Sequence, residues 1–302
     1  MLLNWWQKTR MGSGAYLCER CCSCEESTYT FAPPTGVEGR LNGGFHMANF
    51  HLEATIISRG KGRSVTAAVG YISGKTLRDN YSGKTYYNSR NDVIWQKIFL
   101  PNDAPQEFRN LQHLCNEIEC AEVRRDARTA RQFIGSLPNE LPPGELIRIV
   151  HEFIEDNFLS CSLCAVAAIH RGRNRDDPSR NNPHVHIIVP TRPVGEGGFS
   201  KWKDREHDKR EYITIWREQW AEVQNRAYER NGLDIQVSHE ALEVQGKRDR
   251  EPTIHLSRID WQKEQRGERT PAGDRKRAIK ARNEERVRQR EIKRECELEL
   301  SR

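Results

Sequence analysis

The stretch Asn182-Pro183-His184-Val185-His186-Ile187-Ile188-Val189-Pro190 places two histidines at the start of an apolar, β-branched run. Residues i and i+2 of a strand point to the same face, so His184 and His186 are predicted to project side by side, with Val185 and Ile187 on the opposite face. Neutral imidazole is a common ligand for Zn, Mn, Fe and Ni. The pair therefore predicts half of a metal site.

A third histidine ends a second apolar run, Ala165-Val166-Ala167-Ala168-Ile169-His170. The link from Arg171 to Pro183 is rich in Arg, Asn, Asp and Pro and is typical of a loop. An antiparallel hairpin would bring His170 beside the other two imidazoles. Such a cluster favours a metal site, although ordinary structural histidines of a sheet remain the alternative.

Length and charge bound the class of protein. A chain of 302 residues can bury a substantial core, with one main domain and tails. The formal charge of +6 fits a surface that binds a polyanion, and fits an ordinary basic protein equally well. The sequence has no run of 18 or more apolar residues, and its first 25 residues lack the basic-then-apolar order of a secretory signal, so neither a membrane span nor a signal is expected. The nine cysteines are unevenly spread, and we expect a reduced, cytoplasmic protein.

The patterning predicts three segments. Residues 1–46 hold a compact cysteine cluster without amphipathic periodicity, and we interpret them as an unstructured extension, with Met47 as a candidate start, in preference to a metal knuckle. Residues 47–266 carry regular periodicity and form the predicted main domain. Residues 267–302 are almost all charged and form a predicted helical or disordered tail.

Strands and helices alternate within the main domain. Strands are predicted near 52–56, 93–100, 131–137, 165–170, 184–190 and 235–237, and helices over 65–77, 104–127, 143–158 and 209–230. Ser64 is a candidate N-cap, and Arg59, Lys61 and Arg63 form a basic glycine-containing turn before it. The order of elements indicates an α+β fold with a mostly antiparallel central sheet flanked by helices.

Several motifs in the right order resemble one known family, the MobA/MobL plasmid-mobilisation relaxases of the HUH endonuclease superfamily. His184-Val185-His186 resembles the His-hydrophobic-His signature, and Ala168-Ile169-His170 the third metal histidine. The other similar segments are Met47–Leu52, Ala67–Gly74 around Tyr71, Ala130–Gln132, Ser136–Leu141, Trp216–Ala221, Ser238–Leu242, Gln245–Gly246 and Pro252–Leu256. The resemblance extends from Met47 to about Arg258.

This resemblance implies an enzyme that nicks and religates single-stranded plasmid DNA at a transfer origin. It implies Tyr71 as the nucleophile that forms a 5′-phosphotyrosine, and His170, His184 and His186 as ligands of a divalent ion (Mg or Mn, with Zn or Ni as further candidates). It also implies accessory mobilisation proteins and a coupling protein as partners. Arg59, Lys61, Arg63 and Lys75 are the predicted DNA-binding residues.

Two departures from the family pattern affect the predicted site. The family's glutamate falls at Gln132, a weaker candidate ligand, and Val69-Gly70 stands between the motif's alanines and Tyr71. Two other functions remain open: a non-enzymatic DNA-binding module with a structural metal, and a nucleotide hydrolase of the histidine-triad kind. The second would need a third motif histidine where this chain has Ile188.

Overall fold

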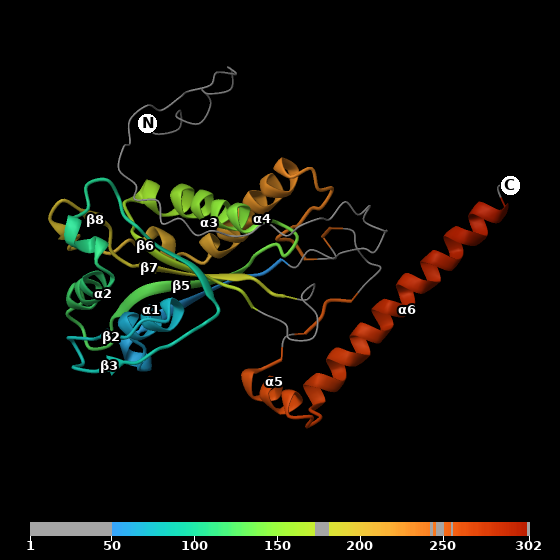
Figure 1. Cartoon of the computed structure of the whole chain (residues 1–302), viewed down its shortest axis with the longest axis horizontal. Helices are drawn as coiled ribbons and strands as arrows, with labels where there is room; N and C mark the ends of the chain where they lie inside the picture. The colour runs from blue at the N-terminus through green and yellow to red at the C-terminus, as the bar shows by residue number, and fades with distance from the viewer. Residues whose placement is uncertain (1–49, 173–180, 242–243, 246–250, 255, 301–302) are drawn as a thin grey trace, which may run out of the picture. The chain divides into compact units, whose positions relative to one another are not determined.

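A computed structural model of the chain describes residues 50–172, 181–241, 244–245, 251–254 and 256–300. The expectations for residues 1–46 and for a start at Met47 lie outside the described residues. Within the described part, the chain forms a mixed α+β structure, as the sequence predicts (Figure 1).

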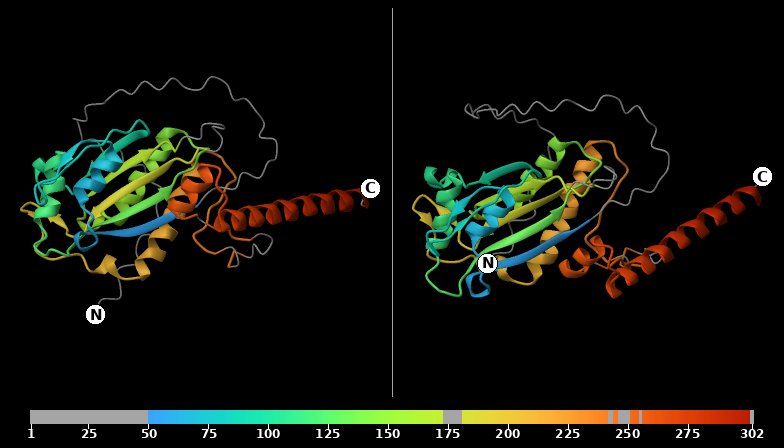
Figure 2. Two further views of the ribbon diagram at one scale, coloured as in Figure 1. Left: turned by 90° about the horizontal axis from the view of Figure 1, so that it is seen from below. Right: turned by 60° about the horizontal axis from the view of Figure 1, so that its bottom comes forward.

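A five-stranded sheet forms the centre of the fold. Its strands are β1 (Leu52–Ser58), β4 (Val93–Phe99), β5 (Arg128–Ser136), β6 (Ala165–His170) and β7 (His184–Pro190). Their order is β1-β5-β7-β6-β4, and every neighbouring pair is antiparallel. Figure 2 shows the same sheet from two other directions. The expectation of an antiparallel central sheet is confirmed.

Two hydrophobic clusters lie on the two faces of this sheet. Alternate strand residues, such as Val185 and Ile187, pack with the long helices α3 (Pro143–Asn157) and α4 (Glu211–Arg230). The intervening residues, such as Ile188, pack with α1 (Val65–Ser73) and α2 (Leu111–Cys120). This division follows from the two-residue period of a strand that is buried on both faces.

The remaining elements are short or lie near the C-terminus. Two small hairpins pair β2 (Leu77–Arg78) with β3 (Thr85–Tyr86) and β8 (Val194–Gly195) with β9 (Gly198–Phe199). The 3₁₀ helices are η1 (Arg59–Lys61), η2 (Gln106–Arg109), η3 (Leu159–Cys161) and η5 (Glu206–Asp208). The last helices are α5 (Arg258–Gln265) and α6 (Pro271–Leu300). No described helix combines the length and apolar character that crossing a membrane requires.

The long helix predicted over 104–127 is divided in the structure. Asn110 has an extended backbone, and its side-chain oxygen accepts the backbone N–H of His113 at 2.9 Å, so α2 begins there. At the other end, the carbonyls of Glu119 and Glu122 accept hydrogen bonds from the Arg59 guanidinium. The side chain of Asn110 at the start and that of Arg59 at the end therefore limit the helix to Leu111–Cys120.

The strand predicted at 235–237 is absent from the structure, which places this described segment beside α4. Val237 donates its N–H to the Asn225 side-chain oxygen at 2.8 Å, and its carbonyl accepts from the Asn225 amide at 2.9 Å. One side chain therefore satisfies the backbone groups that a neighbouring strand would otherwise bind.

Candidate functional site

Three histidines meet where the β6–β7 hairpin begins. The register pairs His170 with His184 and places His186 opposite Ala168, so all three side chains share one face of the sheet. Their ring centroids lie 4.6–5.3 Å apart. One ring nitrogen from each histidine lies within 4.8 Å of the others. The hairpin expected from the sequence is thus present, and it brings the three predicted ligands together.

Backbone carbonyls orient two of these rings. His170 Nε2 lies 2.7 Å from the carbonyl of Ile72, and His184 Nδ1 lies 2.8 Å from that of Asn182. A carbonyl only accepts, so each facing nitrogen carries the proton. His170 Nδ1 and His184 Nε2 then keep their lone pairs. Histidines that bind metals commonly donate their other N–H in this way.

Burial keeps His170 and His186 in the neutral form that binds metals. Desolvation, assisted by neighbouring His170 and His184, lowers the pKa of His186 to about 3. Desolvation also lowers the pKa of His170. The Nδ1 atoms of His170 and His186 are buried and have no hydrogen-bond partner among the described residues. Unpartnered buried nitrogens on neutral rings fit a divalent cation.

Tyr71 projects from α1 beside this cluster. Its ring meets those of His170 and His186 edge-on, with centroid distances of 6.5 and 6.3 Å, and the side chain is 51% exposed. The His170 hydrogen bond to the carbonyl of Ile72 joins the next residue of α1 to the same site. The predicted nucleophile and the predicted ligands are therefore neighbours, although they are about one hundred residues apart in sequence.

Local interactions fix the ends of the helix that carries Tyr71. The Ser64 hydroxyl accepts the N–H of Ala67 at 3.3 Å, which confirms the predicted N-cap. Gly74 ends the helix in the left-handed region, with φ of +67°. A Cβ on Gly70 would lie 2.7 Å from the Asn88 amide nitrogen, so the glycine that departs from the family pattern permits this close approach.

Arg90 is a site residue that the sequence reasoning missed. Its guanidinium carbon lies 4.4 Å from the centroid of the Tyr71 ring. Asp92 holds this guanidinium through bonds of 2.8 Å from Nε and 2.5 Å from Nη2. The ion pair raises the pKa of Arg90 and lowers that of Asp92 to about 2. The spacing Arg-x-Asp before β4 was the available signal, but only the fold brings it to Tyr71.

Residues 63–266 match the MobA/MobL family. The chain belongs to this family. The match includes Tyr71, Arg90 and the three histidines, and it spans most of the described structure.

Several relatives of this MobA/MobL protein are named for DNA transfer. It is 30% identical over 252 residues to a probable mobilization protein MobA of Bifidobacterium longum, covering 69% of this chain and 43% of the relative. It is also 30% identical to the conjugal transfer protein TraA of Agrobacterium fabrum, covering 70% of this chain and 21% of the relative. The chain thus spans less than half the length of these relatives.

A solved structure supports the fold. The structure reported as "Molecular Basis of Vancomycin Resistance Transfer in Staphylococcus aureus" matches 64% of this chain and 98% of its own, with a TM-score of 0.57 and 26% sequence identity. The α+β architecture and antiparallel sheet of the MobA/MobL protein are therefore found in a known structure.

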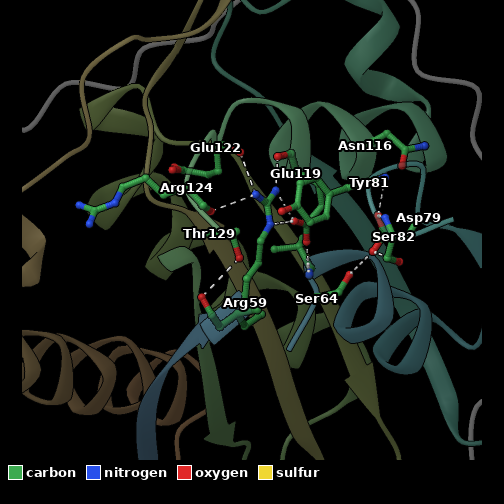
Figure 3. A network of polar contacts seen from close by, with 12 residues as sticks. Arg59, Ser64, Asp79, Tyr81, Ser82, Asn116, Glu119, Glu122, Arg124 and Thr129 are labelled. Atoms are coloured by element: carbon green, nitrogen blue, oxygen red, sulfur yellow. Dashed lines mark hydrogen bonds and ion pairs between the residues drawn. The ribbon is translucent and has the colours of Figure 1, made fainter. Parts of the chain in front are cut away.

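Arg59 does not lie on the surface where DNA binding was predicted. Its guanidinium points inward and binds Glu119 Oε2 at 2.8–2.9 Å and the carbonyl of Glu122 at 2.7 Å, beneath the Tyr81 ring (Figure 3). The side chains of this ion pair are buried: Arg59 is 6% exposed and Glu119 is 1% exposed. Glu119 Oε1 also accepts the N–H of Val65 at 2.6 Å. Arg59 thus joins α2 to the start of α1, and its guanidinium is engaged within the protein instead of facing solvent.

Gln132 lies on the same face of the sheet as the three histidines, but opposite a later residue of β7. It pairs with Ile188, two residues beyond His186. Its side-chain oxygen accepts a 2.5 Å hydrogen bond from Arg63, which also donates to the carbonyl of Ile56. A guanidinium beside this oxygen disfavours a cation there. The Gln132 oxygen is therefore already bound by Arg63, which lies between η1 and α1, and would have to leave this hydrogen bond to ligate a metal ion.

Lys61 and Lys75 remain exposed, as a surface that binds DNA requires. They flank the two ends of the segment that contains α1. Tyr87, which lies in the polar loop after Tyr71, is also exposed. These residues stay candidates for DNA contact.

Proposed function

We propose that this MobA/MobL protein is a relaxase that nicks single-stranded DNA at a plasmid transfer origin. The position of Tyr71 beside a cluster of three histidines carries the proposal. Relatives named as mobilization and conjugal transfer proteins support the same role. Accessory mobilisation proteins and a coupling protein would then be its partners.

The reaction would be a transesterification at one phosphodiester. Tyr71 Oη would attack phosphorus, forming a phosphotyrosine bond as the bond from phosphorus to the 3′ oxygen breaks. The products would be a 5′-phosphotyrosine and a free 3′-OH, because the proton lost by the phenol is matched by the proton that the leaving 3′ oxygen gains. Because the reaction exchanges one phosphodiester for another, the reverse attack of a 3′-OH would rejoin the strand without ATP.

His170, His184 and His186 would hold the divalent ion that this chemistry uses. When bound, the ion supplies positive charge that polarises the scissile phosphate. Three nitrogen ligands without a carboxylate favour Mn, Zn or Ni over Mg, because Mg prefers hard oxygen ligands.

Arg90 would orient Tyr71 for this attack. An ordinary phenol has a pKa of about 10 and is a weak nucleophile near neutral pH. A guanidinium 4.4 Å from the ring centroid holds the ring by a cation–π contact and would place a positive charge near the reacting phosphate. Asp92 would act through Arg90 by holding its orientation.

The two other functions fit the geometry less well. A histidine-triad hydrolase would need a further histidine at Ile188, which is fully buried in the hydrophobic cluster below α1. Structural zinc usually has four ligands that include cysteine. Among the described residues, the metal-ligating cluster contains only the three histidines.

A covalent-capture assay tests the proposal. The protein is incubated with Mn²⁺ and a labelled single-stranded oligonucleotide carrying the transfer origin, and an adduct is sought on a denaturing gel. The adduct should disappear in Tyr71→Phe and persist in Tyr87→Phe, which removes an exposed hydroxyl of the neighbouring loop. An adduct that persists in Tyr71→Phe contradicts the assignment of the nucleophile.

A further inference from the structure

A second candidate site lies at the opposite end of β7 from the histidines. A surface cavity of about 460 Å³ opens there, beyond Thr191 and around Trp202. β7 has seven residues, so a rise of ~3.3 Å per residue separates this Trp202 cavity from His184 by roughly 20 Å. Tyr71, Arg90 and the three histidines do not line this cavity.

Trp202 is presented to solvent on a loop held in place by ion pairs and hydrogen bonds. The side chain is 82% exposed, which is unusual for the largest apolar residue. On one side of it, Lys203 binds Glu122 at 2.9 Å. On the other side, the Ser200 carbonyl accepts a 3.0 Å hydrogen bond from Arg192, which also binds Glu122 at 2.8 Å. The residues on both sides of Trp202 are therefore held in place by contacts that lead to Glu122.

The cavity walls carry an excess of positive charge. Six cationic residues line it, against the three carboxylates Glu122, Asp126 and Asp208: Arg124, Arg128, Arg192, Lys201, Lys203 and Arg205. Glu122 is buried and already bound by two of the cations. Asp208 is bound by the buried Arg131 at 2.8 Å. Arg128 and Lys201 are exposed and have no carboxylate partner among the described residues, so they are available to an anionic ligand.

We propose that the Trp202 cavity is a second binding site for single-stranded DNA, in which a base stacks on Trp202 and the flanking phosphates meet Arg128 and Lys201. An exposed indole between cations suits a strand whose bases are unstacked, because every base offers a π-face and every linkage a negative charge. Bases in a duplex are stacked on one another and do not offer that face. The inference rests on the proposed function for its choice of DNA as ligand.

A DNA strand that reaches both sites would run over the outer surface of the domain, because Ile188 on β7 is buried under α1 and α2. The second site would then hold the DNA about 20 Å from the bond that is cut.

The test uses protein that cannot nick. Tyr71→Phe protein in EDTA is titrated into a fluorescein-labelled oligothymidylate longer than roughly 16 nucleotides, and anisotropy is measured. Trp202→Ala in this background should weaken binding roughly 5- to 150-fold, the range found for loss of one base–aromatic stack. Trp202→Phe should recover much of the affinity. The matched control Trp261→Ala removes another exposed indole (53%), on α5, and should bind as the parent does.

Salt dependence tests the phosphate contacts. The pair Arg128→Gln and Lys201→Gln should reduce the slope of log affinity against log salt by about 1.4, since each phosphate contact on a single strand contributes about 0.7. Parent-like binding by Trp202→Ala, or an equal loss on a duplex of the same length, would overturn the inference.

The covalent-capture assay on the origin oligonucleotide separates the two proposals. Adduct formation with parent-like affinity in Trp202→Ala removes the second site and leaves the nicking function in place. Loss of oligothymidylate binding in Trp202→Ala, together with no adduct in wild-type protein, supports the site and contradicts the nicking function.

Discussion

The buried His186 gives a quantitative prediction for the metal-free protein. Its pKa is about 3 in the folded chain, against about 6.5 in an unfolded one. Because the folded pKa is lower, the unfolded chain binds more protons between these values. The neutral ring therefore contributes stability that is complete above pH 6.5 and is lost as pH falls toward 3. At one pH unit per 1.36 kcal/mol, lowering the pH from 7 to 5 should cost about 2 kcal/mol from this group alone.

Urea denaturation in EDTA at the two pH values measures this cost. A loss of about 2 kcal/mol should lower the urea midpoint by roughly 1 M, for a slope of about 2 kcal/mol per molar. His186→Gln cannot take up the proton, so its stability should fall less between pH 7 and pH 5, by about that amount. The control is His113→Gln, which removes an exposed imidazole. An identical pH dependence in His186→Gln and the parent would show that protonation of His186 does not cause the loss of stability.

Three further variants test the site around it. Arg90→Gln should lower the adduct-formation rate at pH 7 by about fivefold, since a cation–π contact of about 1 kcal/mol that orients the Tyr71 ring is lost, and Arg90→Lys should recover part of it; an unchanged rate would limit Arg90 to packing. Gln132→Glu should give the same dependence on Mg²⁺ and Mn²⁺ as the parent, because its new carboxylate would pair with Arg63; a clear gain in Mg²⁺ would place this position in the metal site. Glu119→Ala should destabilise the domain by about 3–5 kcal/mol in thermal or urea unfolding, because it leaves the Arg59 guanidinium buried without its partner; a loss below about 1 kcal/mol would show that Arg59 finds water.

Features that depend on local periodicity could be predicted from the residues alone. A two-residue period was enough to put His184 and His186 on one face, and an intervening polar loop was enough to predict the hairpin that adds His170. The Ser64 cap depended on a partner only three residues away. Such features need no knowledge of distant partners, because the backbone geometry of one element or one hairpin fixes them.

Contacts between side chains that are distant in sequence could not be predicted before the fold was known. The sequence predicts Arg59 as a surface cation, but the fold places its guanidinium against Glu119, 60 residues away. The sequence predicts Gln132 as a metal ligand, but its side-chain oxygen accepts a hydrogen bond from Arg63, 69 residues away. Arg90 gained its position over Tyr71 in the same manner. Charge and polarity in a sequence give the capacity of a side chain to bind. Its partner is decided by the global packing, because burial makes an unpaired charge costly and selects the one partner within reach.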